Sequence, residues 1–244
     1  MPLENVTGFV LAGGKSTRMG HDKAVLTLQG RTLLEHTLAT LRHVCREAVI
    51  LGSRQLYGDY DAVVVEDIFP GCGPLSGIHA ALSHTDTEFN LIIAVDTPFL
   101  SAEFLSFMAQ RAVSSGAVVS TPEIGGYRQP LCSVYSRAFL PLAEAALRGE
   151  QDPSSASRGS ERTQSEGEAS AAKSRDYKTA KSSDYKTGKS RDYKIVPLFP
   201  VDGTCVIPEE ELRRFAFAPE MFENINTPAD MERARRRGAA TPDL

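Results

Sequence analysis

Short apolar runs alternate along the chain with stretches whose apolar residues recur at helical spacing. Five runs rich in β-branched residues predict buried strands, at residues 8–11, 48–51, 62–65, 91–95 and 117–120. Strands that alternate with helices pack best as a mostly parallel sheet with helices on both faces. The pattern therefore predicts an α/β fold, in which ligands bind at the carboxyl ends of the strands.

Two of the predicted helices have recognisable starts. Thr32 and Glu35 have the spacing of a capping box, and Ser101 is a typical N-cap residue. The apolar positions expected to face the core are Leu34, Leu38 and Leu41 in the first helix, and Phe104, Leu105, Met108 and Ala112 in the second.

Residues 151–194 break this pattern, because they contain almost no large apolar side chains. From residue 173 an eight-residue unit repeats, with Tyr177, Tyr185 and Tyr193 in equivalent positions. Such a segment cannot bury enough apolar surface to offset the cost of ordering its backbone, roughly 1–2 kcal/mol per residue. We therefore expect one domain, formed by residues 1–150 and 195–244, with a disordered insertion at 151–194. Its basic residues leave a weak contact with RNA or an anionic surface as an alternative to a solvated tether.

Composition and charge narrow the class of protein. Of 244 residues, 41% are hydrophobic, which is adequate for a sizeable core, and the formal net charge of −4 makes nucleic acid an unlikely partner. The chain starts without a basic, apolar leader and has no apolar run of membrane-spanning length. The four cysteines are isolated in sequence. We expect a cytoplasmic protein without a membrane segment or structural zinc.

A glycine-rich, basic loop follows the first predicted strand. Gly13 and Gly14 let the backbone approach an oxygen-rich ligand closely, and Lys15, Arg18 and Lys23 add positive charge. The loop lacks the first glycine of a Walker A motif and does not have the G-x-G-x-x-G spacing of a dinucleotide-binding loop. We therefore predict that the loop binds the phosphates of a nucleotide but belongs to another class of phosphate-binding loop.

Two aspartates follow predicted strands. Asp96 comes directly after the run 91–95, where a carboxylate can hold Mg²⁺ on a triphosphate, and Asp67 comes after the run 62–65. From spacing alone, Asp96 could equally be a turn residue before Thr97-Pro98, and a turn or cap residue is the alternative for Asp67.

Residues 11–23 read Leu-Ala-Gly-Gly-x-Ser-x-Arg-Met-Gly-x-Asp-Lys, which resembles the signature loop of nucleotidyltransferases, most closely the molybdenum cofactor guanylyltransferases. The resemblance continues through Gly73-Pro-Leu-Ser-Gly-Ile78, Asp96-Thr-Pro98 and Asn224-Ile-Asn-Thr-Pro-Ala-Asp230, and covers about residues 6–150 and 195–237. The adjacent Gly13 and Gly14 resemble the guanylyl branch, because cytidylyl relatives more often carry Leu-Ala-Ala-Gly.

The resemblance implies a Rossmann-like, three-layer nucleotidyltransferase fold of the GT-A-like kind. It also implies the transfer of GMP from GTP to the terminal phosphate of Mo-molybdopterin, with Mg²⁺ as cofactor and pyrophosphate as product. Proteins of molybdenum insertion and molybdoenzyme maturation are the partners to expect. A cytidylyl- or sugar-phosphate nucleotidyltransferase of the same fold, or a non-catalytic module that delivers nucleotide or cofactor, remain alternatives.

The resemblance also assigns roles to individual residues. Lys23, Arg18 and Asp96 would be catalytic, with Asp96 as the metal ligand. Asn224 and Asn226 would bind the pterin substrate. The nucleotide would be bound by Leu11, Ala12, Gly13, Gly14, Lys23, Asp67 and Asp96.

Overall fold

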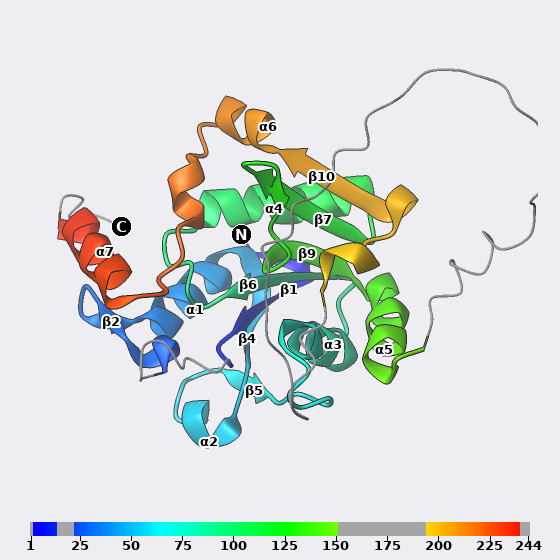
Figure 1. The fold of residues 1–244 in the computed structure, drawn as a ribbon, viewed down its shortest axis with the longest axis horizontal. Coiled ribbons are helices and arrows are strands. Elements are labelled where there is room, and N and C mark those ends of the chain that lie inside the picture. The colour runs from blue at the N-terminus through cyan, green and yellow to red at the C-terminus, as the bar shows by residue number, and fades with distance from the viewer. Residues whose placement is uncertain (1, 14–21, 151–193, 240–244) are drawn as a thin grey trace, which may run out of the picture.

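An eight-stranded sheet organises the chain in a computed structural model, which describes residues 2–13, 22–150 and 194–239 (Figure 1). The strands follow the order β10 (Thr204–Pro208), β7 (Val119–Ile124), β9 (Cys132–Ser136), β6 (Phe89–Ala94), β1 (Leu3–Leu11), β4 (Cys45–Leu51) and β5 (Val63–Val65), and β8 (Tyr127–Arg128) pairs with β7. A separate hairpin consists of β2 (Thr27–Leu28) and β3 (Arg31–Thr32).

The sheet is mostly parallel, as the sequence predicts. β1 pairs in parallel with β4 and β6, β4 with β5, and β7 with β10. β9, which the apolar pattern does not identify, runs antiparallel between β6 and β7. The strand predicted at 117–120 is displaced, because Gly116 ends the preceding helix in the left-handed region (φ 63°) and β7 begins only at Val119.

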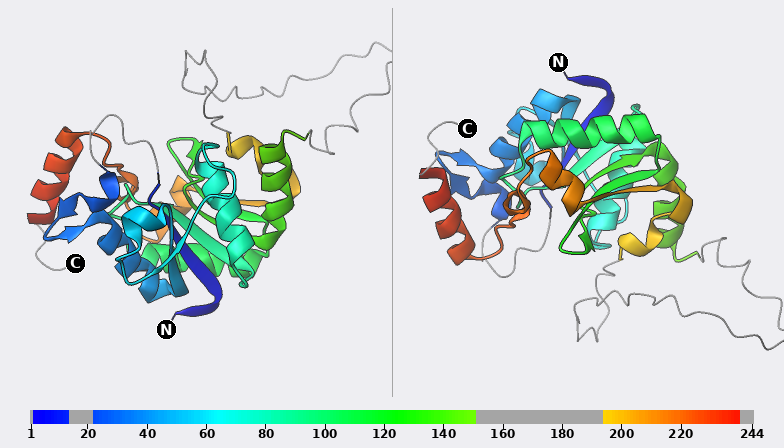
Figure 2. Two further views of the ribbon diagram at one scale, coloured as in Figure 1. Left: turned by 90° about the horizontal axis from the view of Figure 1, so that it is seen from below. Right: turned by 90° about the horizontal axis from the view of Figure 1, so that it is seen from above.

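Helices cover both faces of the sheet (Figure 2). One face packs against α1 (Leu33–Val44), α4 (Ala102–Ser115) and the short α6 (Glu209–Arg214), and the other against α3 (Pro74–His84) and α5 (Leu140–Arg148). The apolar positions predicted for the first two helices are all buried. Two apolar cores, one on each face, therefore hold three layers together. Within the described residues, no helix is both long and apolar enough to cross a membrane.

The remaining elements lie at the margins of these layers. They are α2 (Arg54–Tyr57), α7 (Pro228–Ala239) and the 3₁₀ turns η1 (Lys23–Val25), η2 (Arg137–Phe139), η4 (Val196–Leu198), η5 (Val201–Gly203) and η6 (Pro219–Phe222).

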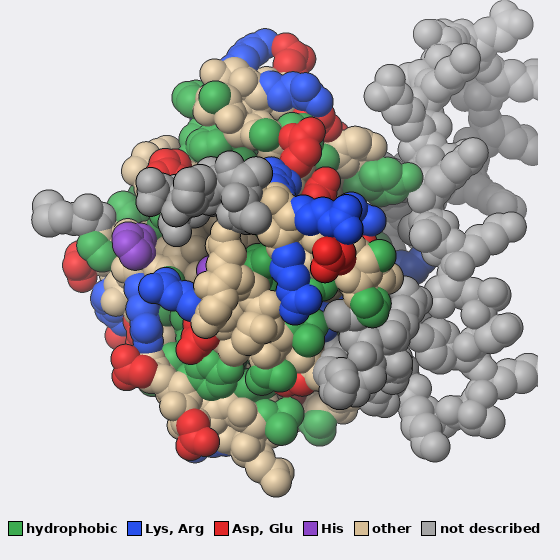
Figure 3. Space-filling model, turned by 90° about the vertical axis from the view of Figure 1, so that its left-hand side faces the viewer, with side chains coloured by type: hydrophobic (Ala, Val, Ile, Leu, Met, Phe, Trp, Pro, Cys, Tyr) green, Lys and Arg blue, Asp and Glu red, His purple; other side chains and the backbone are tan. Residues whose placement is uncertain are grey.

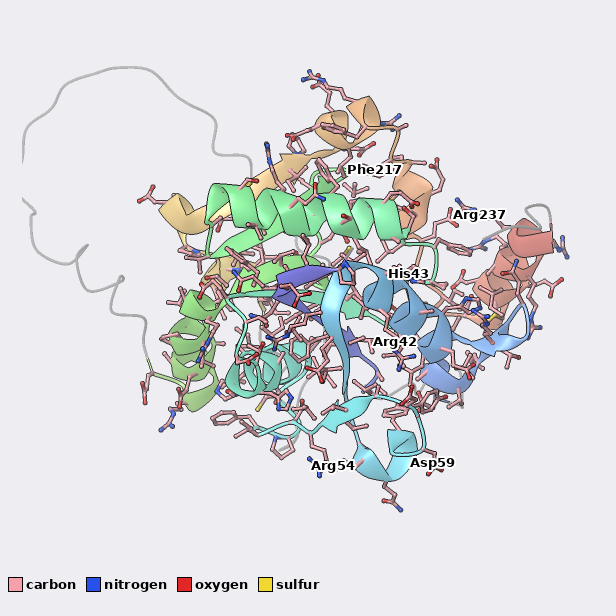
Figure 4. All side chains as sticks on the ribbon, turned by 180° about the vertical axis from the view of Figure 1, so that it is seen from behind. Arg42, His43, Arg54, Asp59, Phe217 and Arg237 are labelled. Carbon is pink, nitrogen blue, oxygen red and sulfur yellow. The ribbon has the colours of Figure 1, made fainter. Side chains whose placement is uncertain are left out.

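The C-terminal helix α7 packs beside the β2–β3 hairpin (Figure 1, Figure 2). The Arg237 guanidinium reaches from this helix to the ring of Phe99, 4.7 Å from its centroid (Figure 4). Acidic and basic side chains are interspersed over this side of the molecule (Figure 3), and Arg233 and Arg236 pair with Asp230 and Glu232 of their own helix.

The parallel strands end in register at one edge of the sheet. Val65 of β5 lies opposite Leu51 of β4, which lies opposite Leu11 of β1, and Leu11 lies opposite Ala94 of β6. The Ala94 N–H donates to the carbonyl of Leu131 at 2.9 Å, which brings the segment before β9 to the same edge. Residues that follow these strands therefore gather at one place.

Both predicted helix starts have the expected geometry. The Thr32 hydroxyl accepts the Glu35 N–H at 3.1 Å, and the Glu35 carboxylate accepts the Thr32 N–H at 2.6 Å. Hydrogen bonds from Thr32 lower the pKa of the Glu35 carboxyl. Ser101 accepts the Phe104 N–H at 3.2 Å in the same way.

We expect Thr32→Ala to lower the free energy of unfolding by about 1 kcal/mol, because it removes the side-chain cap of α1. Urea denaturation measures this loss. Ser53→Ala is the matched control, since Ser53 precedes α2 without making a side-chain cap hydrogen bond. Equal losses in both variants would contradict the assignment of the capping box.

Candidate active site

Three residues that the sequence assigns to the site lie together at this edge. The ammonium group of Lys23 donates to Asp96 Oδ2 at 3.0 Å and to Asn226 Oδ1 at 2.6 Å. The Lys23 and Asp96 side chains keep 18% and 20% of their surface exposed. This ion pair is thus partly withdrawn from water, where charges interact more strongly than at the open surface, yet a ligand can still reach it.

The turn η1 holds Lys23 in this position. Asp22 is the N-cap of the turn, and its Oδ1 accepts the Ala24 N–H at 3.0 Å. Ala24, the middle residue of the turn, is fully buried, so the core anchors the turn directly after Lys23.

A sharp turn after β6 positions Asp96. The N–H of Val95 still donates to Leu11 of β1, at 3.1 Å, and then the Thr97 hydroxyl bonds back to the Ala94 carbonyl at 2.8 Å. The side-chain hydrogen bond of this turn is therefore made by Thr97, while the Asp96 carboxylate is bonded to Lys23. The arrangement favours a site residue over a turn residue at position 96.

The C-terminal segment brings Asn226 to the pair. Its Ile225 is buried and donates its N–H to the Asp96 carbonyl at 2.8 Å, while the flanking Asn224 and Asn226 are exposed. Asp230 accepts the N–H groups of Asn226 and Thr227, at 3.0 and 2.7 Å. The Thr227 side chain and then these backbone bonds lower the pKa of Asp230. The start of α7 therefore fixes the backbone that carries the Asn226 side chain.

The two N–H groups directly after β1 are bonded within the protein. The N–H groups of Ala12 and Gly13 both donate to the Leu51 carbonyl, at 3.0 and 3.2 Å. They are therefore engaged within the protein, and this stretch can offer a ligand close approach rather than donors. Gly14 and Arg18 lie outside the residues that the structure describes.

Asp67 lies at the other end of the same edge, after β5. A Cβ atom placed on Gly77 would stand 2.3 Å from Leu11 Cδ2 and 3.8 Å from Asp67 Oδ1, so these three residues are neighbours. Three strand spacings separate β5 from β6, about 14 Å. Asp67 and Asp96 therefore follow strands that are not neighbours in the sheet, and both could contact one extended ligand.

The surroundings of Asp67 shift its titration. The residue as a whole is exposed, but its carboxyl is partly withdrawn from water, and this desolvation raises the pKa of Asp67, opposed by a hydrogen bond with Ser76.

The donor set suits a metal that is shared with a substrate. In residues 2–13, 22–150 and 194–239, no group of three or more His, Cys, Asp and Glu side chains could hold a metal ion. Mg²⁺, however, usually binds one or two carboxylates and takes its other ligands from phosphates and water. A partly exposed carboxylate at Asp96, close to the amide oxygen of Asn226, fits that mode of binding.

Sequence reasoning missed one residue of this region, Tyr57, and gave Asp22 no role. The Tyr57 hydroxyl lies 2.6 Å from Asp22 Oδ2 and 3.0 Å from the Ala12 carbonyl. Asp22 stands beside Lys23 in the signature loop, which could have drawn attention to it, whereas Tyr57 stands in a polar stretch without periodicity.

Comparisons with known proteins identify the family of this chain. The family described as "MobA-like NTP transferase domain" matches residues 8–165. A probable molybdenum cofactor guanylyltransferase of Pelotomaculum thermopropionicum is 30% identical over 230 residues, which cover 94% of this chain and 91% of the relative. A molybdenum cofactor guanylyltransferase of Desulfosudis oleivorans is 37% identical over 147 residues, 59% of this chain and 72% of the relative.

Solved structures show the same fold. The crystal structure of molybdopterin-guanine dinucleotide biosynthesis protein A from Archaeoglobus fulgidus superposes with a TM-score of 0.69, at 24% identity, over 96% of this chain and all of the other. A 2-C-methyl-D-erythritol 4-phosphate cytidylyltransferase from Thermus thermophilus reaches a TM-score of 0.56 at 16% identity, over 98% of this chain and 100% of the other. The nucleotidyltransferase fold is therefore confirmed.

We expect Asp67→Asn to raise the free energy of unfolding at pH 7. The folded state raises the pKa of Asp67 above its ordinary 3.8, so its charged form destabilises the fold once the pH exceeds the raised value. The gain should vanish below the ordinary pKa, where wild-type Asp67 is protonated in both states. Urea denaturation at pH 7 and pH 3 measures both.

Asp86→Asn is a control in which the free energy of unfolding should change in the opposite direction. A hydrogen bond from Arg46 lowers the pKa of Asp86, so this variant should lose stability at pH 7, by an amount that fades as the pH falls through that lowered pKa. A destabilised Asp67→Asn variant at pH 7 would contradict the desolvation of Asp67.

Proposed function

Because this chain belongs to the family of MobA-like NTP transferase domains, we propose that it transfers GMP from GTP to the terminal phosphate of Mo-molybdopterin and releases pyrophosphate. Nucleotidyl transfer is the activity that the family relationship establishes, and GTP and the molybdenum-carrying pterin are the proposed substrates. The observation that carries the proposal is the group formed by Lys23, Asp96 and Asn226 at the carboxyl edge of the sheet.

The proposed nucleotidyl transfer requires positioned substrates and positive charge rather than a strong base. The attacking group is a phosphate oxygen that is already largely ionised at neutral pH, so no proton has to be removed from it. The Lys23 ammonium would neutralise the charge that develops at the α-phosphate. Arg18, for which we propose contact with the pyrophosphate, lies outside the described residues.

Asp96 would hold Mg²⁺, with the amide oxygen of Asn226 beside it. When bound, this ion would neutralise the triphosphate and favour the departure of pyrophosphate. The Asp96 carboxylate is paired with Lys23, and this pair holds both charges in position.

The rest of the edge accommodates the two substrates in this proposal. Asp67, together with Leu11, would contact the base or ribose of the nucleotide, at the end of the edge away from Asp96. Asn224 and Asn226 would contact the pterin substrate from the C-terminal segment. We further propose a cytoplasmic enzyme that hands its product to proteins of molybdoenzyme maturation.

The first test is pyrophosphate release from GTP, CTP and ATP, each with Mg²⁺ and Mo-molybdopterin. We expect release from GTP alone, and its loss in Lys23→Ala. A preference for CTP would overturn the guanylyl assignment but not nucleotidyl transfer. GTP binding in calorimetry without pyrophosphate release would point to a delivery module instead.

Asp96→Asn should lower turnover by on the order of a hundredfold or more, because it removes one electrostatic stabiliser of the reacting phosphates. Asp86→Asn is a matched control, since Asp86 precedes β6 whereas Asp96 follows it, and it should keep wild-type turnover. Turnover measured at limiting Mg²⁺ is the sensitive assay. A near-normal rate of Asp96→Asn under that condition would exclude Asp96 as the metal ligand.

A further inference from the structure

The hydroxyl of Tyr57 joins two parts of the chain that flank the site. It comes from α2, in the crossover between β4 and β5, and Figure 4 labels Arg54 and Asp59 on either side of it. On one side lies the Ala12 carbonyl, at 3.0 Å, directly after β1. On the other lies Asp22 Oδ2, at 2.6 Å, directly before the turn that carries Lys23.

The packing of its ring fixes where this hydroxyl lies. Tyr57 is only 2% exposed, and its ring meets Tyr60 edge-on with centroids 6.4 Å apart. A Cβ atom at Gly52 would stand 2.7 Å from Tyr57 Cε2, so the ring occupies space that opens only because position 52 has no side chain. Gly52 in turn is tied to the sheet, since its N–H donates to the Val65 carbonyl at 2.9 Å.

The chemistry of the contact favours Asp22 as the main acceptor. A phenol has one proton to donate, and a carboxylate is a stronger acceptor than an amide carbonyl. The 2.6 Å separation from Asp22 lies in the range of a charge-assisted O–H···O⁻ bond. Burial, together with the bond to Asp22, raises the pKa of Tyr57 far above its ordinary value, so the donor keeps its proton at any working pH.

The two carboxylate oxygens of Asp22 connect the Tyr57 hydroxyl to the turn that contains Lys23. One oxygen, Oδ2, accepts from Tyr57, and the other, Oδ1, accepts the Ala24 N–H and caps the turn η1. Lys23 is the residue between Asp22 and Ala24, and its side chain crosses to Asp96. An unbroken chain of short contacts therefore runs from the buried ring to the catalytic ammonium group.

We propose that Tyr57 is a positioning residue for nucleotidyl transfer, which fixes Asp22 and thereby the turn that holds Lys23 against Asp96. Its kinetic consequence rests on the function proposed above, whereas its structural consequence, the placement of Lys23, does not. The hydroxyl, not the ring, carries the effect.

Tyr57→Phe tests this directly, because it keeps the ring and removes the donor. We expect kcat/KM for GTP to fall about tenfold, mainly through kcat, while the thermal midpoint changes little. Tyr60→Phe is the matched control: its hydroxyl lies 3.5 Å from Thr32 and should be dispensable. The double variant with Asp22→Asn should lose no more than the worse single variant, because both changes interrupt the same chain of contacts.

Acylation of the Lys23 amine by sulfo-N-hydroxysuccinimidyl acetate, followed by mass spectrometry, provides a readout that needs no turnover. Lys23 should react severalfold faster in Tyr57→Phe than in wild type, while the exposed Lys194 reacts equally in both. Equal Lys23 acylation rates in Tyr57→Phe and wild type would overturn the inference. So would a double variant whose loss of kcat/KM equals the product of the two single losses. A wild-type protein that is inactive with GTP would refute only the proposed function, since the labelling would still decide the role of Tyr57.

Discussion

The parallel register of β5, β4, β1 and β6 is the constraint on which the site depends. Because Val65, Leu51, Leu11 and Ala94 lie side by side, every residue that follows these strands emerges at one level on one edge. A slip of one residue between two of these strands would move side chains that fit the core on one face into the core on the other. The packing that stabilises the sheet therefore also aligns the residues that meet a ligand.

The sequence predicts best what depends on neighbouring residues. Thr32 and Ser101 start their helices as expected, since a cap needs only a side chain and an N–H group a few residues away. The strand before Asp96 and the clustering of site residues also follow, through the rule for parallel sheets. The antiparallel strand β9 does not follow from the apolar pattern, because its five buried residues include two serines and a tyrosine.

Within the site, the residues that sequence reasoning missed are those that act on others. Lys23 and Asp96 carry the charge that the proposed chemistry would use, and so their residue types and a familiar motif point to them. Tyr57 contributes a hydroxyl across 35 positions of sequence to Asp22, and its role depends on the space beside Gly52. Contacts of that kind arise from tertiary packing, which no local pattern encodes.

Each hydrogen bond around the site contributes little to the free energy of folding in comparison with the apolar cores. A single hydrogen bond contributes about 0.5–1.5 kcal/mol net, whereas burial of one leucine such as Leu34 or Leu75 contributes about 1.5–3 kcal/mol. The fold would therefore survive the loss of any one of them. A displacement of about 1 Å at a reacting group can nevertheless lower a rate about a hundredfold. Tyr57, Asp22 and Asp230 thus matter for where Lys23 and Asn226 lie, much more than for whether the chain folds.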